Sequence, residues 1–81
     1  MDANTLMGTV GAMIILHAFI LNQVGKWKVS TFYYDLSNFV GSAILVIYSI
    51  MIASYPFMVL NLVWATVSLK DIILGIQGKA K

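Results

Sequence analysis

No charged side chain occurs between residues 36 and 69, LSNFVGSAILVIYSIMIASYPFMVLNLVWATVSL, a stretch long enough to cross a membrane twice. A helix rises 1.5 Å per residue, so about 20 apolar residues span the hydrocarbon core of a bilayer. Pro56 lies inside this stretch, and proline suits the first turn of a helix but costs about 3 kcal/mol within one. We therefore expect two antiparallel helices, over residues 32–53 and 56–74, joined by a tight turn.

A second uncharged stretch, residues 3–25, precedes the first. A secretory signal peptide would begin with positive charge and end in a small-residue cleavage site, whereas this stretch begins after Asp2 and has no such site. It is therefore predicted to be a retained helix over residues 5–24. The whole chain, residues 1–81, is expected to be one all-α domain, a three-helix transmembrane bundle.

The composition excludes several classes of protein. Sixty per cent of the residues are hydrophobic and 10% are charged, whereas soluble domains carry about 25% charged residues. The net charge of +2 is small and lies near helix ends, so nucleic-acid binding is not expected. With no cysteine and one histidine, the chain lacks a hydrolytic triad, a phosphate loop and a metal-spaced cluster, and we expect no enzyme.

The lysines predict the topology. Three spans place the first loop, with Lys26 and Lys28, on the same side as the C-terminal end, with Lys70, Lys79 and Lys81. The opposite side holds neither lysine nor arginine. Because lysine-rich loops stay in the cytoplasm, the predicted topology is N-out/C-in, in the bacterial cytoplasmic (inner) membrane.

Polar residues inside the spans recur at helical spacing. They fall on one face of each of two helices: Asp35, Asn38, Ser42, Leu45, Ser49 and Ile52 on the second, and Asn61, Ala65 and Ser68 on the third. Lipid offers polar groups no partner, so these faces should meet each other, the first helix or a second subunit. One interpretation is helix packing, aided by the small-residue pairs Gly8 with Ala12 and Ser37 with Gly41. The other is a polar site or pathway, for which the candidates are Tyr34, Asn38, Tyr48, Asn61, Trp64 and His17.

His17 is the single histidine of the chain and lies within the first predicted helix. Such a residue can hydrogen-bond a neighbouring helix, relay protons, or supply one axial ligand to haem or a chlorophyll-type pigment. The helix-partner interpretation is preferred, and no cofactor or metal is predicted. Lys70 and Asp71 lie only about 21 Å along the third helix, so they either anchor the helix end or pair with Asp35 or the first loop.

Two segments resemble a family of small, uncharacterised bacterial three-span proteins that are sometimes labelled permeases. Tyr34-Asp-Leu-Ser-Asn38-Phe-Val-Gly41 is similar to that family's Tyr-x-x-x-Asn-x-x-Gly segment. Tyr55-Pro56-Phe-Met-Val-Leu60-Asn61-Leu-Val-Trp64 is similar to its Tyr-Pro-x-x-x-Leu-Asn-x-x-Trp segment. The resemblance implies that these residues matter, but it brings no established activity.

A looser similarity is to the SemiSWEET half-transporters, three-helix units that dimerise around a pocket lined by asparagine and tryptophan. Asn61 and Trp64 would match those residue types, but Asn22-Gln23 stands where that family has its Pro-Gln hinge. In SemiSWEETs the third helix lies between the other two.

Two functions follow as hypotheses. The first is a homo-oligomeric half-transporter for a small solute, with a site near the membrane midplane. The second is an accessory subunit of a larger respiratory, photosynthetic or transport complex, in which His17 contacts a cofactor. Membrane lipid is an expected partner in both.

Overall fold

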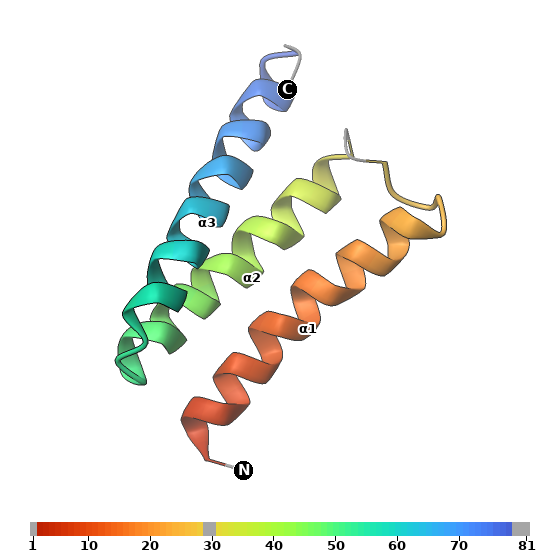
Figure 1. The fold of residues 1–81 in the computed structure, drawn as a ribbon. Coiled ribbons are helices and arrows are strands. Elements are labelled where there is room, and N and C mark those ends of the chain that lie inside the picture. Colours follow the sequence, from red (N-terminus) through yellow and green to blue (C-terminus); the bar gives the residue numbers. More distant parts are fainter. Residues whose placement is uncertain (1, 29–30, 79–81) are drawn as a thin grey trace.

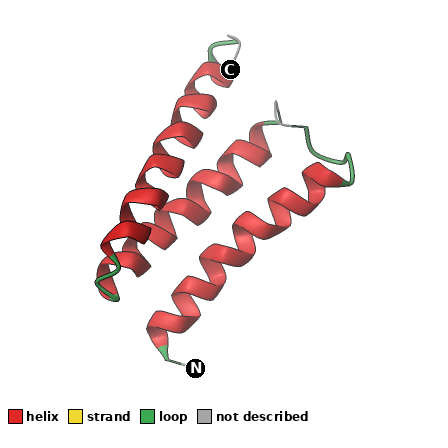
Figure 2. Ribbon diagram, in the orientation of Figure 1, coloured by secondary structure: helices red, strands yellow, loops and turns green. Residues whose placement is uncertain are grey.

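The computed structural model describes residues 2–28 and 31–78, so Lys79 and Lys81 lie outside the described residues. Three helices form: α1 (Ala3–Gln23), α2 (Phe32–Met51) and α3 (Tyr55–Ile76), as Figure 1 and Figure 2 show. Each is long and apolar enough to span a membrane. The prediction of three membrane-length helices is confirmed.

The helix ends differ from the predicted ones by a few residues, for local reasons. α1 begins earlier because the Asp2 side chain accepts a hydrogen bond from the Thr5 backbone N–H at 2.7 Å. α2 ends at Met51, since Ala53 adopts a left-handed φ of 55° that breaks the helix. Pro56 lies in the first turn of α3, as expected.

The three helices form an open layer with α2 in the middle. α1 and α3 each pack against α2, and no described Cα atom of α1 lies within 8 Å of one in α3. The molecule is correspondingly flat, with principal dimensions of 39, 23 and 16 Å, and Figure 1 shows the helices side by side. The three predicted helices are therefore arranged as an open layer, in which α1 and α3 do not contact each other.

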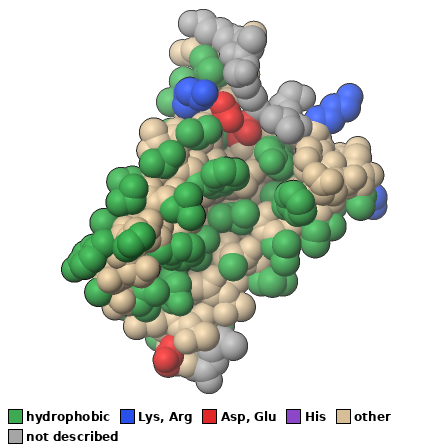
Figure 3. Space-filling view, in the orientation of Figure 1, with side chains coloured by type: hydrophobic (Ala, Val, Ile, Leu, Met, Phe, Trp, Pro, Cys, Tyr) green, Lys and Arg blue, Asp and Glu red, His purple; other side chains and the backbone are tan. Residues whose placement is uncertain are grey.

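Polar residues lie inside this layer and apolar residues lie outside. The buried polar side chains are Asp35, Asn38, Ser42, Ser49, Asn61 and Ser68. The buried hydrophobic ones in the described part of the chain are only Ala18, Leu45, Ala65 and Ile72. Large hydrophobic side chains cover the surface instead (Figure 3). This distribution fits a membrane-spanning protein, whose exterior contacts lipid and whose polar groups must find partners within protein.

The predicted polar faces of α2 and α3 are confirmed, with one exception. Every member of both faces is buried except Ile52, which lies beyond the end of α2 and is exposed.

The charged residues gather at the ends of the layer. Lys26, Lys28 and Lys70 lie at the end that carries the α1–α2 loop and the C-terminal end of α3, and Asp2 lies at the other (Figure 3).

Candidate functional site: two hollows that share Trp64

Glycines bring α1 and α2 close together. A Cβ atom added to Gly41 would lie 3.0 Å from the Gly11 carbonyl oxygen and 2.6 Å from Ile15 Cγ1. One added to Gly8 would lie 2.8 Å from the Tyr48 ring. The partner of Gly8 along α1 is thus Gly11, whereas the predicted partner Ala12 is exposed and lines a groove. Gly8 and Gly11 are three residues apart, and both lie on the side of α1 that faces α2.

A hydrogen bond between side chains connects α2 to α3. The Trp64 indole Nε1–H donates to Asn38 Oδ1 at 3.3 Å, and Asn38 Nδ2 donates to the Tyr34 carbonyl oxygen at 2.9 Å. Both ends of the Asn38 amide are therefore engaged. Most other buried polar groups bond within their own helix, as where Ser49 donates to the Leu45 carbonyl oxygen at 2.6 Å. Such bonds satisfy donors without linking helices.

The first hollow is a polar pocket of about 150 Å³ between α2 and α3. Most of its lining residues are polar or aromatic: Tyr34, Asp35, Asn38, Trp64, Val67, Ser68 and Asp71. Asp35 is only 3% exposed and makes a further interaction, so its carboxylate is not free. Lys70 Nζ lies 3.6 Å from Asp71 Oδ1. The Lys70–Asp71 ion pair therefore forms between chain neighbours, with no lysine of the first loop involved.

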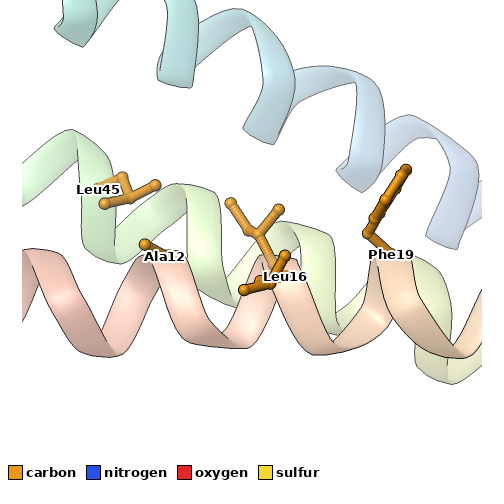
Figure 4. A pocket seen from close by; sticks show the side chains of 5 residues that line it. Ala12, Leu16, Phe19 and Leu45 are labelled. Atoms are coloured by element: carbon orange, nitrogen blue, oxygen red, sulfur yellow. The ribbon is translucent and has the colours of Figure 1, made fainter.

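The second hollow is a mostly apolar groove between α1 and α3. One part, of about 250 Å³, is lined by Ile15, Leu60, Asn61 and Trp64. A larger part of about 530 Å³ shares Ile15 with it and lies between α1 and α2, lined by Ala12, Ile15, Leu16, Phe19 and Leu45. Figure 4 shows this part, where Phe19 projects from α1 toward α3. Trp64 lines both the groove and the polar pocket.

The structure brings together four of the six candidate residues. Tyr34, Asn38 and Trp64 line the polar pocket, and Asn61 joins Trp64 in the groove. Tyr48 lies elsewhere: its ring packs against Gly8 and meets the Phe57 ring at 6.4 Å between centroids.

His17 lies apart from both hollows. Its side chain is exposed, and its ring meets the Trp27 ring edge-on at 5.5 Å between centroids. At about 100° per residue, it lies on the opposite side of α1 from the groove residues Ile15 and Phe19. In the single chain His17 therefore lines neither hollow, and its role in a polar site or in helix packing stays a prediction. In the described part of the chain, no group of three His, Cys, Asp or Glu residues can hold a metal ion.

Four residues that line the polar pocket were not among the candidates: the polar residues Asp35, Ser68 and Asp71, and the apolar Val67. Asp35 and Ser68 belong to the polar faces seen in the sequence, so the periodicity did carry a signal for them. Asp71 lies outside that pattern, and only the packing of α3 on α2 shows its place.

The aromatic residues Trp27, Phe32 and Tyr33 cluster at the lysine-bearing end, as expected of a membrane-interface belt.

Three membrane-length helices with a polar interior and an apolar exterior fit the class of small multi-pass helical membrane proteins. A family model of uncharacterised bacterial-type proteins matches residues 4–79, and the chain belongs to this family. No curated protein and no solved structure matches the chain. Nothing in these comparisons connects it to permeases or SemiSWEETs, and the central helix is α2, where SemiSWEETs have their third.

Proposed function

We propose that the chain is a homo-oligomeric half-transporter for a small polar solute. The groove beside Asn61 supports this proposal most directly. Asn61 is 5% exposed and donates its Nδ2–H to the Phe57 carbonyl oxygen at 2.8 Å. No described residue donates to its Oδ1, and Asn61 is the polar amide among the residues that line this groove. A solute hydroxyl or amine would satisfy this acceptor.

The open side of the layer is the reason to expect more than one copy. Residues of α1 and α3 line the two sides of the groove. The two helices do not contact each other, so a single chain leaves the groove open. A second copy that presents its own groove would enclose a central space lined twice by Asn61 and Trp64. Transporters built from repeats hold their sites at such interfaces, near the membrane midplane.

Single-cysteine variants test the arrangement, since the chain has no native cysteine. Leu60→Cys places a thiol in the groove, and Leu62→Cys places one on the other side of α3 as a matched control. Copper-phenanthroline treatment of membranes should yield a disulfide-linked dimer with Leu60→Cys alone. A water-filled pathway should also let a membrane-impermeant methanethiosulfonate react at residue 60 and not at residue 62. Equal behaviour of both variants would reject the facing-groove dimer.

Transport itself is tested with purified protein in proteoliposomes. Radiolabelled glucose, glycine and methylammonium represent neutral, zwitterionic and cationic polar solutes. We expect uptake of at least one of them above protein-free vesicles, and a loss of that uptake in Asn61→Leu but not in the lipid-facing control Leu62→Ile. Uptake that is unaffected by Asn61→Leu would remove the groove from the mechanism.

We further propose that the lysine-bearing end faces the cytoplasm, which gives the N-out/C-in topology. The described lysines Lys26, Lys28 and Lys70 support this by sharing one end of the molecule. Moving Lys26 and Lys28 to the N-terminus should disturb the orientation, as read by reporter fusions at the C-terminus. An unchanged orientation would contradict the charge argument.

An accessory subunit of a larger membrane complex is the second candidate, and the exposure of His17 favours it. A neighbouring protein or a bound haem or chlorophyll-type pigment could reach this imidazole from outside the chain. Native mass spectrometry of gently extracted protein separates the candidates. A homo-oligomer favours the half-transporter, whereas a heteromeric assembly or a bound pigment favours the subunit.

A further inference from the structure

We propose that the groove beside Asn61 binds a neutral alcohol in preference to an amine, a zwitterion or an anion. This inference names the solute class of the proposed half-transporter. It rests on that function for the movement of the solute but not for its binding. The argument depends on a buried amide that is only partly bonded, on the uncharged lining of the groove and on the hydrogen-bonding capacity of a hydroxyl.

The Asn61 amide is buried but only partly bonded. One N–H of Nδ2 donates to the Phe57 carbonyl oxygen, while the second N–H and Oδ1 have no hydrogen-bond partner among the described residues. No fully buried side-chain nitrogen or oxygen in the described part of the chain lacks a partner, so Oδ1 keeps some accessible surface. Asn61 lines the groove and does not line the polar pocket. A group bound in the groove would therefore supply the missing partner.

The other buried asparagine, Asn38, shows what a fully engaged amide looks like in this molecule. Its Oδ1 accepts from the Trp64 indole and its Nδ2 donates to the Tyr34 carbonyl oxygen. Asn61 has the second kind of bond but not the first. The difference leaves Asn61 as a buried acceptor at a membrane-spanning helix, where lipid offers no donor.

The lining of the groove disfavours a charged solute. Apart from Asn61, every residue that lines either part of the groove is apolar or aromatic. Asp35 and Asp71 line the polar pocket instead. An ion without a charged partner costs far more to bury than a hydroxyl that is hydrogen-bonded. Alkylamines are protonated near neutral pH, so the same cost applies to them and to a zwitterion.

A hydroxyl is the smallest neutral group that matches the free part of the Asn61 amide. Its O–H donates to Oδ1, and its oxygen accepts from the second Nδ2–H. Ethers, ketones and esters have no donor for Oδ1, and an amide brings more polar atoms that must lose water. The Trp64 Nε1–H is engaged by Asn38, so the indole adds no free donor to the groove. The carbon skeleton of an alcohol then packs against the apolar lining.

The test follows Trp64 fluorescence in the full-length protein in lipid nanodiscs, with Trp27→Phe as background so that one tryptophan remains. Tribromoethanol is the probe, because its bromine atoms quench an indole on contact. The reference is tribromoethane, in which a methyl group replaces the hydroxymethyl group, compared at equal concentration in the membrane. We expect saturable quenching by the alcohol and only linear, collisional quenching by the reference.

Asn61→Leu keeps the approximate size of the side chain and removes its hydrogen-bonding groups, so it should weaken tribromoethanol binding about tenfold. Thr66→Val is the matched control, since Thr66 bonds the Leu62 carbonyl oxygen within α3 and lines neither hollow. It should leave binding unchanged.

Competition in the Trp27→Phe protein keeps the test decisive if Asn61→Leu does not fold. Cyclohexanol should displace the probe, whereas cyclohexylammonium chloride, which has the same ring, should not. The proposal is overturned by the absence of saturable quenching, by saturable quenching with tribromoethane, by equal displacement with the two competitors, or by equal losses in Asn61→Leu and Thr66→Val.

The outcomes also separate the two proposals. Saturable binding of tribromoethanol, without uptake of any solute into proteoliposomes, would retain the alcohol site and reject the half-transporter. Uptake of glycine or methylammonium that is lost in Asn61→Leu, without saturable binding of the alcohol, would retain the half-transporter and reject the alcohol site.

Discussion

The two helix interfaces of this small protein are built in different ways. α1 meets α2 at Gly8, Gly11 and Gly41, where the absence of side chains lets the two helices approach closely and pack by van der Waals contact. α3 meets α2 beside a polar pocket, where the Trp64 indole bonds Asn38. Lipid is as apolar as leucine, so neither interface gains much from hydrophobic burial. The first interface is expected to tolerate no added volume, and the second is expected to tolerate volume but not the loss of polar partners.

The largest expected effect comes from adding volume to the α1–α2 interface. Gly41→Ala would bring a methyl group within 2.6 Å of Ile15 Cγ1 and 3.0 Å of the Gly11 carbonyl oxygen. We expect a loss of about 1–3 kcal/mol in unfolding free energy, measured by denaturant titration in bicelles. Val40→Ile adds one carbon at the neighbouring exposed position and should have little effect. Equal losses in the two variants would contradict the close-packing account.

A smaller effect is expected from breaking the polar link between α2 and α3. A double-mutant cycle with Trp64→Phe and Asn38→Leu should give a coupling free energy of about 0.6–2 kcal/mol. The same cycle between Trp64→Phe and Ser49→Ala serves as the control, since Ser49 bonds within its own helix. A coupling near zero for the first pair would mean that the indole only packs, and the contrast between the interfaces would fail.

Asp2 gives a smaller and local effect, and it tests whether α1 depends on its own cap. The hydrogen bonds from Thr5 hold the pKa of the Asp2 carboxyl below its ordinary value of 3.8. A lowered pKa means that the stabilisation is present above the ordinary value and is lost as the pH falls through the lowered one. Protection of the Thr5 amide from hydrogen exchange should therefore fall below about pH 4, and Asp2→Ala should abolish this dependence. A dependence that persists in the variant would assign it to another group.

The smallest effect is expected at Lys70. Its side chain is largely exposed and pairs with its neighbour Asp71, so Lys70→Met should barely change detergent extraction or oligomeric state. Size-exclusion chromatography with light scattering gives the comparison. Collapse of the oligomer would show that this charge contributes to the polar interface.

The polar residues show how far the sequence predicts the site. The 3-4 spacing identified the buried faces of α2 and α3 because a helix turns by a constant angle per residue. His17 was a candidate because it is the single histidine within a membrane-length helix, not because of spacing, and in the single chain it lies on the exposed side of α1 against Trp27. A lone histidine has no periodic partners, so nothing in its own helix indicates which way it faces.

The glycines and the pocket show the same limit. Gly8 was expected to pair with Ala12, but the side of α1 that packs on α2 passes through Gly11. Asp71 was expected either to anchor the helix end or to pair with Asp35 or the first loop, and the structure places it in one pocket with Asp35 and Ser68. Both outcomes depend on the rotation of each helix about its own axis relative to its neighbour. The sequence of a single helix does not specify this rotation.

The sequence alone determined three membrane-length helices, their turn at Pro56 and the end at which Lys26, Lys28 and Lys70 gather. These features depend on the length of uncharged stretches, on proline geometry and on chain direction, which are local properties. Only the tertiary structure decided that α2 is central, that Gly11 meets Gly41, and that Trp64 lines both a groove and a polar pocket. These features arise from contacts between residues far apart in the chain, where small differences in close packing select one arrangement among several that share the same hydrophobic pattern.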